Sequence, residues 1–266
     1  MLGLFKPKRS VIGSDFAGKI VAKGNLVKDF DLEDRVFGFV DQGVGSQAQF
    51  MSISRDHLFR IPKDVDYKTA AAGLEGAHYA YTFLHKVSIV DGQSILINGA
   101  TGGIGSALLQ FVNQYDVNIT ATANTRNVAL IKSLGADRVI DYTKEDFTKI
   151  SEKFDFVFDA VGKSTFGKCR PLLKEKGVYI SSELGPYSQN LFFSLYSLFF
   201  GKQKVIFPYP YPQKKTIPYI SQCLLNKTFN PVIDRVYSFE NIAKAYEYVL
   251  KGEKTGNVVI SVNDDQ

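Results

Sequence analysis

The segment from Ile95 to Gly105 constrains this chain most, because it combines an apolar run, a glycine-rich turn and apolar residues at helical spacing. A glycine fingerprint between a strand and a helix indicates a dinucleotide site. Gly99 or Ala100 would allow a sharp turn, and Gly105 would let the helix pack closely on the strand. The free N–H groups at the helix start would bind phosphates. The alternative is a glycine turn between an ordinary strand and helix. The residues expected to bind the cofactor in this turn are Ala100, Thr101, Gly102, Gly103 and Ile104.

Composition excludes several classes of protein. The net charge of +5 is modest and the lysines are scattered, which argues against a nucleic-acid surface. Cys169 and Cys223 do not form a disulfide framework, and with no recognisable signal peptide they indicate a reducing, cytoplasmic location. The apolar stretch Leu191–Phe200 is too short to span a bilayer. We expect it to form a buried helix or a pocket wall, with membrane contact as the alternative.

The chain has two kinds of residue pattern, one before and one after Gly92. Short alternating runs up to Pro62 predict strands at Phe16–Ala22, Arg35–Val40 and Gln47–Ile53, and an alanine-rich linking helix is expected at Tyr67–His85. After Gly92, strands and helices alternate, which predicts a parallel sheet covered on both faces. The expected strands are 94–98, 117–123, 138–141, 155–159, 176–181 and 204–207, and the expected helices are 103–115, 126–134, 164–173, 187–199 and 214–226. The tail predicts a strand, a helix and a strand at 232–237, 239–250 and 257–262.

Several motifs in register carry a family resemblance. They are Gly13-Ser-Asp-Phe-Ala-Gly, Asp34-Arg-Val-Phe-Gly, Leu58-Phe-Arg-Ile-Pro, Asn98-Gly-Ala-Thr-Gly-Gly-Ile-Gly, Lys132-Ser-Leu-Gly-Ala-Asp, Ile140-Asp-Tyr-Thr, Phe158-Asp-Ala-Val-Gly and Gly256-Asn-Val-Val-Ile. In this order they resemble the medium-chain dehydrogenase/reductase superfamily, on its zinc-independent, quinone-oxidoreductase-like side.

The resemblance implies an α/β fold: a Rossmann doubly wound parallel sheet plus an incomplete GroES-like β domain. Met1 corresponds to a point well inside that catalytic domain, so its opening strands are expected to have no counterpart here. The implied domains are 1–90, a partial GroES-like catalytic domain with the linking helix; 91–230, the Rossmann domain; and 231–266, the return to the catalytic domain.

A metal site is not expected. The resemblance implies a comparison with the zinc alcohol dehydrogenases of the superfamily, which have a Gly-His-Glu pattern where this chain has Gly13-Ser14-Asp15. A serine with one carboxylate cannot hold zinc. The two cysteines are far apart, and the three histidines have no ligand spacing.

The end of the second Rossmann strand favours NADPH over NADH. An NAD site usually has an acid there that holds the ribose 2′-hydroxyl, whereas this chain has Asn124-Thr125-Arg126. A guanidinium attracts a 2′-phosphate. The alternative leaves Arg126 as a solvated residue of the first helical turn. The resemblance places a cofactor-contacting tyrosine at Tyr142.

Further cofactor contacts are expected from residues that come just after the predicted strands. Val161, with Ser182 and Leu184, would line the ribose and nicotinamide, since ligands bind at the carboxyl ends of such strands. Asp159 would either cap the next helix or contact the ligand. The resemblance places a cofactor-proximal polar residue at Asn257. The catalytic residues are unknown: Tyr79 and His78 could donate a proton, but packing explains them better.

The first hypothesis is an NADPH-dependent oxidoreductase that transfers a hydride to a quinone, enone or aldehyde without zinc. The alternative is a catalytically impaired nucleotide-binding protein or a gene fragment. A methyltransferase also has a glycine turn, but would usually have an acid after the second strand. The expected partner is a small apolar carbonyl or quinone substrate, with no nucleic acid and no membrane, and a homodimer is left open.

Overall fold

The computed structural model describes residues 11–41 and 43–262. By their contacts they form two compact units: one runs up to Glu75 and resumes at Gln213, and the other is Gly76–Pro212. The expected domain boundaries at 90/91 and 230/231 follow the family's scheme and stay a prediction. The compact units divide earlier in the chain at both points.

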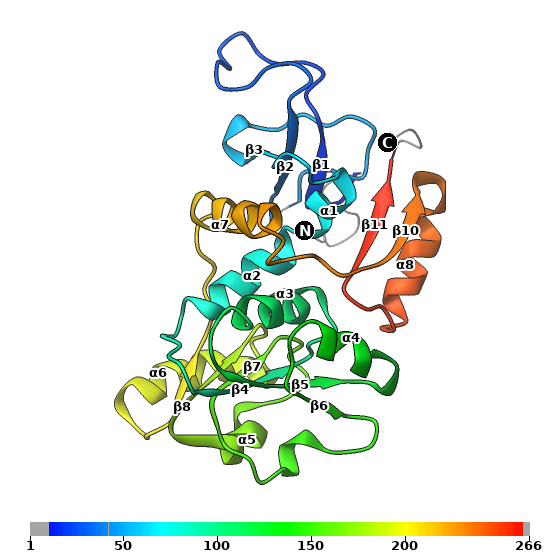
Figure 1. The fold of residues 1–266 in the computed structure, drawn as a ribbon. Helices are drawn as coiled ribbons and strands as arrows, with labels where there is room; N and C mark the ends of the chain where they lie inside the picture. The colour runs from blue at the N-terminus through cyan, green and yellow to red at the C-terminus, as the bar shows by residue number, and fades with distance from the viewer. Residues whose placement is uncertain (1–10, 42, 263–266) are drawn as a thin grey trace. The chain divides into compact units, whose positions relative to one another are not determined.

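The unit Gly76–Pro212 contains a six-stranded parallel sheet with the order β6-β5-β4-β7-β8-β9 (Figure 1). The chain enters at a central strand, winds outward to β6, returns beside β4 and winds outward again to β9, so the sheet is doubly wound. This arrangement confirms the predicted Rossmann-type α/β fold. The strands are β4 (Ser94–Asn98), β5 (Asn118–Ala123), β6 (Arg138–Asp141), β7 (Phe154–Asp159), β8 (Leu173–Ser181) and β9 (Lys204–Ile206).

Helices cover both faces of this sheet. Phe166 and Phe193 pack on a buried cluster that includes Tyr179 and Val205. On the opposite face, the Phe83 ring meets the Phe158 ring edge-on, with centroids 6.0 Å apart. The α-helices of this part of the chain are α2 (Glu75–Leu84), α3 (Gly103–Val112), α4 (Val128–Ser133), α5 (Phe166–Cys169) and α6 (Gln189–Phe199). Short 3-10 helices lie at Thr125–Asn127, Phe147–Lys149, Arg170–Leu172 and Pro186–Ser188.

The other unit holds a small antiparallel sheet in the order β1-β2-β3 and a parallel pair, β10 and β11. Its buried side chains include Phe37 and Phe39. Its elements are β1 (Asp15–Lys19), β2 (Arg35–Phe39), β3 (Phe59–Arg60), α1 (Tyr67–Ala72), α7 (Gln213–Leu225), β10 (Ile233–Ser238), α8 (Ile242–Leu250) and β11 (Asn257–Ser261), with 3-10 helices at Arg55–His57 and Phe239–Asn241.

Three expectations are wrong. Gln47–Ile53 is not a strand: it pairs with neither sheet of its unit, and Phe50 is exposed. The linking helix is two helices, since α1 ends at Ala72 and α2 begins at Glu75. The stretch Leu191–Phe200 is helical but not buried, for most of its apolar side chains are exposed. In the described part of the chain, no helix is both long and apolar enough to cross a membrane.

Candidate dinucleotide site

The glycine turn joins β4 to α3. Gly99 carries the positive φ of 80°, so it makes the turn, while Ala100 is buried. A Cβ on Gly105 would lie 2.1 Å from the Gly99 carbonyl oxygen, so only glycine lets the helix come this close. A Cβ on Gly102 would meet nothing nearer than 3.6 Å. The backbone at Gly102, which is the N-cap of α3, is therefore open to an incoming group.

A buried polar network fixes the carboxyl ends of four strands. The Asn98 amide nitrogen donates to Asp159 Oδ1 (2.9 Å), and the Thr122 hydroxyl donates to Asn98 Oδ1 (2.8 Å). The Tyr179 hydroxyl donates to Asp159 Oδ2 (3.0 Å); burial, and then the charge of Asp159, raises the pKa of Tyr179. Asp159 also accepts from the backbone N–H groups of Gly162 and Ser164. These contacts use both oxygens of Asp159, so its observed role is to hold the loop after β7.

The loop after β5 presents the residues expected to select the cofactor. Thr125 and Arg126 are exposed and Asn124 is half-buried. Asn124 Oδ1 is buried and has no hydrogen-bond partner among the described residues. A buried carbonyl oxygen without a donor costs free energy, so a ligand hydroxyl or amine would stabilise it.

The next strand brings an acid to this loop. The Thr125 hydroxyl donates to Asp141 Oδ2 (2.5 Å), and the hydroxyl and N–H of Thr143 donate to Asp141 Oδ1. These hydrogen bonds, Thr125 first, lower the pKa of Asp141 to about 2. Lys144 Nζ lies 3.4 Å from the same carboxylate. Sequence reasoning missed Asp141 as a site residue, although it is the last residue of the expected strand 138–141. The structure places it beside Thr125 and next to Tyr142, which is exposed.

The remaining predicted contacts lie at two places. Val161 and Leu184 are exposed, and the Ser182 N–H donates to the Asp159 carbonyl (3.1 Å). These three follow β7 and β8, so they share the carboxyl edge of the sheet with the glycine turn. Asn257 lies in the other unit, on β11, where its side-chain amide donates to the Val232 carbonyl (3.1 Å).

The residues present fit a dinucleotide. The open Gly102 backbone and the start of α3 suit a pyrophosphate, and the unsatisfied Asn124 oxygen suits a polar group of the adenosine half. Both follow strands at the same edge of one parallel sheet, where ligands of such sheets bind.

A pair of carboxyl groups lies in the smaller unit. The Ser14 hydroxyl donates to Asp15 Oδ2 (2.7 Å) and lies 3.5 Å from Glu75 Oε2. The Glu75 N–H donates to Asp15 Oδ1 (3.1 Å). Burial, and then the charge of Asp15, raises the pKa of Glu75 to about 7, and burial also raises the pKa of Asp15. Within the described ranges, no three His, Cys, Asp or Glu side chains are grouped so that they could hold a metal ion.

His78, which packing was expected to explain better than proton donation, and both cysteines are buried, while Tyr79 is half-buried. His78 is 1% exposed, and its ring meets that of Tyr79 edge-on. Cys169 and Cys223 are buried, and burial raises the pKa of Cys169 to about 11.

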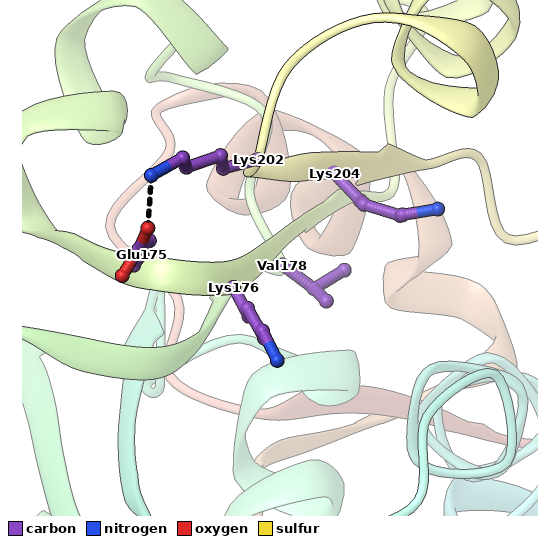
Figure 2. Close-up of a pocket in the computed structure, with 5 residues that line it drawn as sticks. All are labelled: Glu175, Lys176, Val178, Lys202 and Lys204. Atoms are coloured by element: carbon purple, nitrogen blue, oxygen red, sulfur yellow. Dashed lines mark hydrogen bonds and ion pairs between the residues drawn. The ribbon is translucent and has the colours of Figure 1, made fainter.

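A pocket of about 380 Å³ lies elsewhere, along β8 and β9 (Figure 2). Its lining residues are Glu175, Lys176, Val178, Lys202 and Lys204. An ion pair joins Lys202 to Glu175. The pocket includes none of the predicted cofactor residues.

Known proteins match this chain along most of its length. A family model described as zinc-binding dehydrogenase matches residues 134–260. The chain is 32% identical to 2-methylene-furan-3-one reductase of Solanum lycopersicum, over 97% of this chain and 66% of that protein. It is 31% identical to the chloroplastic NADPH-dependent alkenal/one oxidoreductase of Arabidopsis thaliana, over 96% and 64%. The chain thus spans just under two thirds of the length of these relatives.

Solved structures show the same fold. The quinone oxidoreductase of Coxiella burnetii superposes with a TM-score of 0.82 at 23% identity, over 95% of this chain and 79% of that one. A structure described as NAD-dependent alcohol dehydrogenase gives a TM-score of 0.83 at 20% identity, over 97% and 84%. The family model and the two relatives above 30% identity, together with this shared fold, confirm the resemblance: the chain belongs to the medium-chain dehydrogenase/reductase superfamily, in its quinone-oxidoreductase-like branch.

Proposed function

We propose that this protein is an NADPH-dependent oxidoreductase that transfers a hydride to a quinone, an enone or an aldehyde without zinc. The observation that carries the proposal is the strand–turn–helix at Gly99–Gly105, with an open backbone at Gly102. Bound NADPH would supply the hydride, and the protein would supply binding, orientation and a proton path. The names of the tomato and Arabidopsis relatives, a reductase and an NADPH-dependent alkenal/one oxidoreductase, support an activated carbonyl as the substrate class.

Each half of the cofactor would have its own residues. Gly102, Gly103 and the start of α3 would hold the pyrophosphate, and Thr125 with Arg126 would hold the 2′-phosphate. The nicotinamide half would lie along the loops after β7 and β8. The residues assigned to it are Val161, Ser182 and Leu184, with Tyr142 and Asn257 as further cofactor contacts.

NADH is the second candidate cofactor, and Asp141 is the observation that favours it. A carboxylate within hydrogen-bond distance of the Thr125 hydroxyl could accept from a ribose hydroxyl and would repel a 2′-phosphate. The position of Arg126 on the same loop, and the Lys144 ammonium beside Asp141, favour NADPH. Titration of protein and cofactor fluorescence with both nucleotides tests this choice. Tighter binding of NADH would reject NADPH.

Turnover separates the enzyme from a nucleotide-binding protein without activity. The purified chain would be incubated with NADPH and a quinone, an alkenal and an aldehyde, and NADPH oxidation would be followed by absorbance. A kcat within the common enzyme range of about 1–10³ s⁻¹ supports the oxidoreductase. Tight NADPH binding without turnover supports the alternative. The domain scheme 1–90, 91–230 and 231–266 is proposed on the family resemblance, and a cytoplasmic location on the two cysteines, which form no disulfide framework.

A further inference from the structure

The glycine turn is held by a side chain from the neighbouring strand. Gly99 has a φ of 80°, and a glycine has no side chain that would limit its backbone to one conformation. Its N–H donates to the Thr122 hydroxyl on β5 (3.0 Å), and its carbonyl accepts from the N–H of Gly102 (3.1 Å). Thr122 is therefore linked through Gly99 to the residue at which the pyrophosphate is proposed to bind.

The Thr122 hydroxyl is itself oriented by an ordered chain of donors and acceptors. Asp159 accepts in each of its side-chain hydrogen bonds, so it takes the amide nitrogen of Asn98, and the Asn98 oxygen is left to accept from Thr122. Because the hydroxyl donates its one proton to Asn98, it presents its oxygen to the N–H of Gly99. The chain therefore has a single direction, from the carboxylate to the turn.

A packing contact closes this chain into a ring. Asp159 holds the loop after β7, because it accepts from the N–H groups of Gly162 (3.1 Å) and Ser164 (3.2 Å). Val161 in that loop lies against the turn: a Cβ built on Gly99 would fall 2.6 Å from the Val161 Cβ. The turn proposed for the pyrophosphate and the loop proposed for the nicotinamide half are thus joined by hydrogen bonds on one side and by direct packing on the other.

The side chains of this ring are enclosed. Thr122 is 1% exposed, and Asn98 and Asp159 are buried as well. A buried hydroxyl does not reach a nucleotide bound at the edge of the sheet, so any effect of Thr122 on binding passes through Gly99. Buried polar groups that lose a partner are costly, so the ring specifies one arrangement of the turn.

We propose that Thr122 is a positioning residue for the dinucleotide: its hydroxyl holds Gly99 in the conformation that presents the start of α3 to the pyrophosphate. The inference rests on the proposed function, and it assigns nucleotide affinity to a buried residue that does not touch the ligand. NADPH and NADH share the pyrophosphate, so displacement of the turn would weaken both alike. Loss of Arg126, by contrast, is expected to weaken NADPH alone.

Two substitutions at Thr122 separate positioning from support of the fold. Thr122→Val has nearly the same shape but no hydroxyl, so the Gly99 N–H and Asn98 Oδ1 lose their partner. Thr122→Ser keeps the hydroxyl and removes a methyl group from the core. Both variants should melt at a lower temperature than the original chain. Only Thr122→Val should bind NADPH and NADH about tenfold more weakly, with the ratio of their dissociation constants changed by less than about twofold; Thr122→Ser should bind both within about twofold of the original.

Fluorescence titration gives the dissociation constants, at a temperature where circular dichroism shows every variant to be folded. Thr122→Ala is a second variant without the hydroxyl and should weaken both nucleotides severalfold. Amide hydrogen exchange followed by NMR needs no nucleotide: the Gly99 N–H should exchange at least about tenfold faster in Thr122→Val and at the original rate in Thr122→Ser. Thr120→Val is the matched control, because Thr120 is buried two residues earlier on β5 and takes no part in the ring. It should bind both nucleotides as the original chain does.

Several outcomes would overturn the inference. Unchanged nucleotide binding by Thr122→Val does so, as does an unchanged exchange rate at Gly99. An equal loss of binding in Thr122→Ser would assign the effect to core packing, and a loss for NADPH alone would assign it to the 2′-phosphate. An original chain that binds neither nucleotide overturns the proposed function and this inference with it, so the two failures differ in which protein fails to bind.

Discussion

The Thr125 hydroxyl donates a 2.5 Å hydrogen bond to the carboxylate of Asp141 and so ties the loop after β5 to the end of β6. Thr143 binds the same carboxylate, so three side chains from two loops form one unit. This unit lies where the adenosine ribose of a dinucleotide is proposed to bind. Under the proposed function, the selection of NADPH or NADH would therefore depend on Asp141 as well as on Arg126.

Asp141→Asn should shift selectivity toward NADPH. The change removes a negative charge close to the proposed 2′-phosphate but keeps an oxygen that can accept from Thr125. We expect the ratio of the NADH and NADPH dissociation constants to rise severalfold in fluorescence titrations at about 0.05 M salt, where screening is weak. An unchanged ratio would mean that the 2′-phosphate binds away from Asp141.

Arg126→Ala should weaken NADPH binding by roughly 1–3 kcal/mol, the range for a hydrogen bond to a charged group. NADH has no 2′-phosphate, so its affinity should stay within about twofold, a difference of roughly 0.4 kcal/mol. Arg138→Ala is the matched control, because Arg138 is exposed on the next strand and paired with Glu152. An equal loss for both nucleotides would show that Arg126 supports the fold of the loop rather than the phosphate.

Alanine at two glycines of the same turn should affect different properties, nucleotide binding at Gly102 and fold stability at Gly105. At Gly102 a Cβ has room, so Gly102→Ala should melt within about 0.5 kcal/mol of the original chain yet bind both nucleotides roughly tenfold more weakly. At Gly105 a Cβ would collide with the Gly99 carbonyl, so Gly105→Ala should destabilise the fold by roughly 1–3 kcal/mol. Urea unfolding and nucleotide titration measure the two effects. Unimpaired binding by Gly102→Ala would exclude this turn as the pyrophosphate site.

The Glu75 carboxyl should make stability fall as the pH rises. Its folded pKa of about 7 lies above the ordinary value of 4.5, so protonation favours the folded state. The contribution is complete below pH 4.5 and is lost as the pH rises through 7. Between pH 5 and pH 8 the free energy of unfolding should drop by roughly 1–2 kcal/mol from this group.

Glu75→Gln should flatten this dependence and raise the stability at pH 8, while Glu240→Gln, on an exposed turn, should leave it unchanged. Urea titrations at several pH values provide the measurement. A dependence that persists in Glu75→Gln would assign it to another group.

Purified protein should contain no stoichiometric zinc. Asp15 and Glu75 contact Ser14 and each other, and the described side chains include no group of three potential ligands. Elemental analysis should find well under one zinc per chain, and a chelator should not alter NADPH binding. One tightly held zinc per chain would refute the zinc-independent mechanism.

Local patterns in the sequence determined the doubly wound sheet and the glycine turn. The alternation of apolar strands and helices after Gly92 predicts a parallel sheet, and Gly99–Gly105 predicts where the chain turns, because both depend on neighbouring residues. The family resemblance rested on the same short motifs. These features follow from side-chain period and backbone freedom, which act over a few residues.

Tertiary structure decided what depends on residues distant in sequence. Gln47–Ile53 alternates like a strand, but no strand of the small sheets pairs with it, and a strand needs such a partner from elsewhere in the chain. The apolar run Leu191–Phe200 was expected inside, yet Ser197 turns inward, where its hydroxyl accepts from the N–H of Val205 on the edge strand β9. Asp141 meets Thr125 only because β5 and β6 are neighbours. Burial and hydrogen-bond pairing are properties of the packed chain, so the sequence alone determined the fold of the dinucleotide unit, and packing decided which charges and which apolar faces surround it.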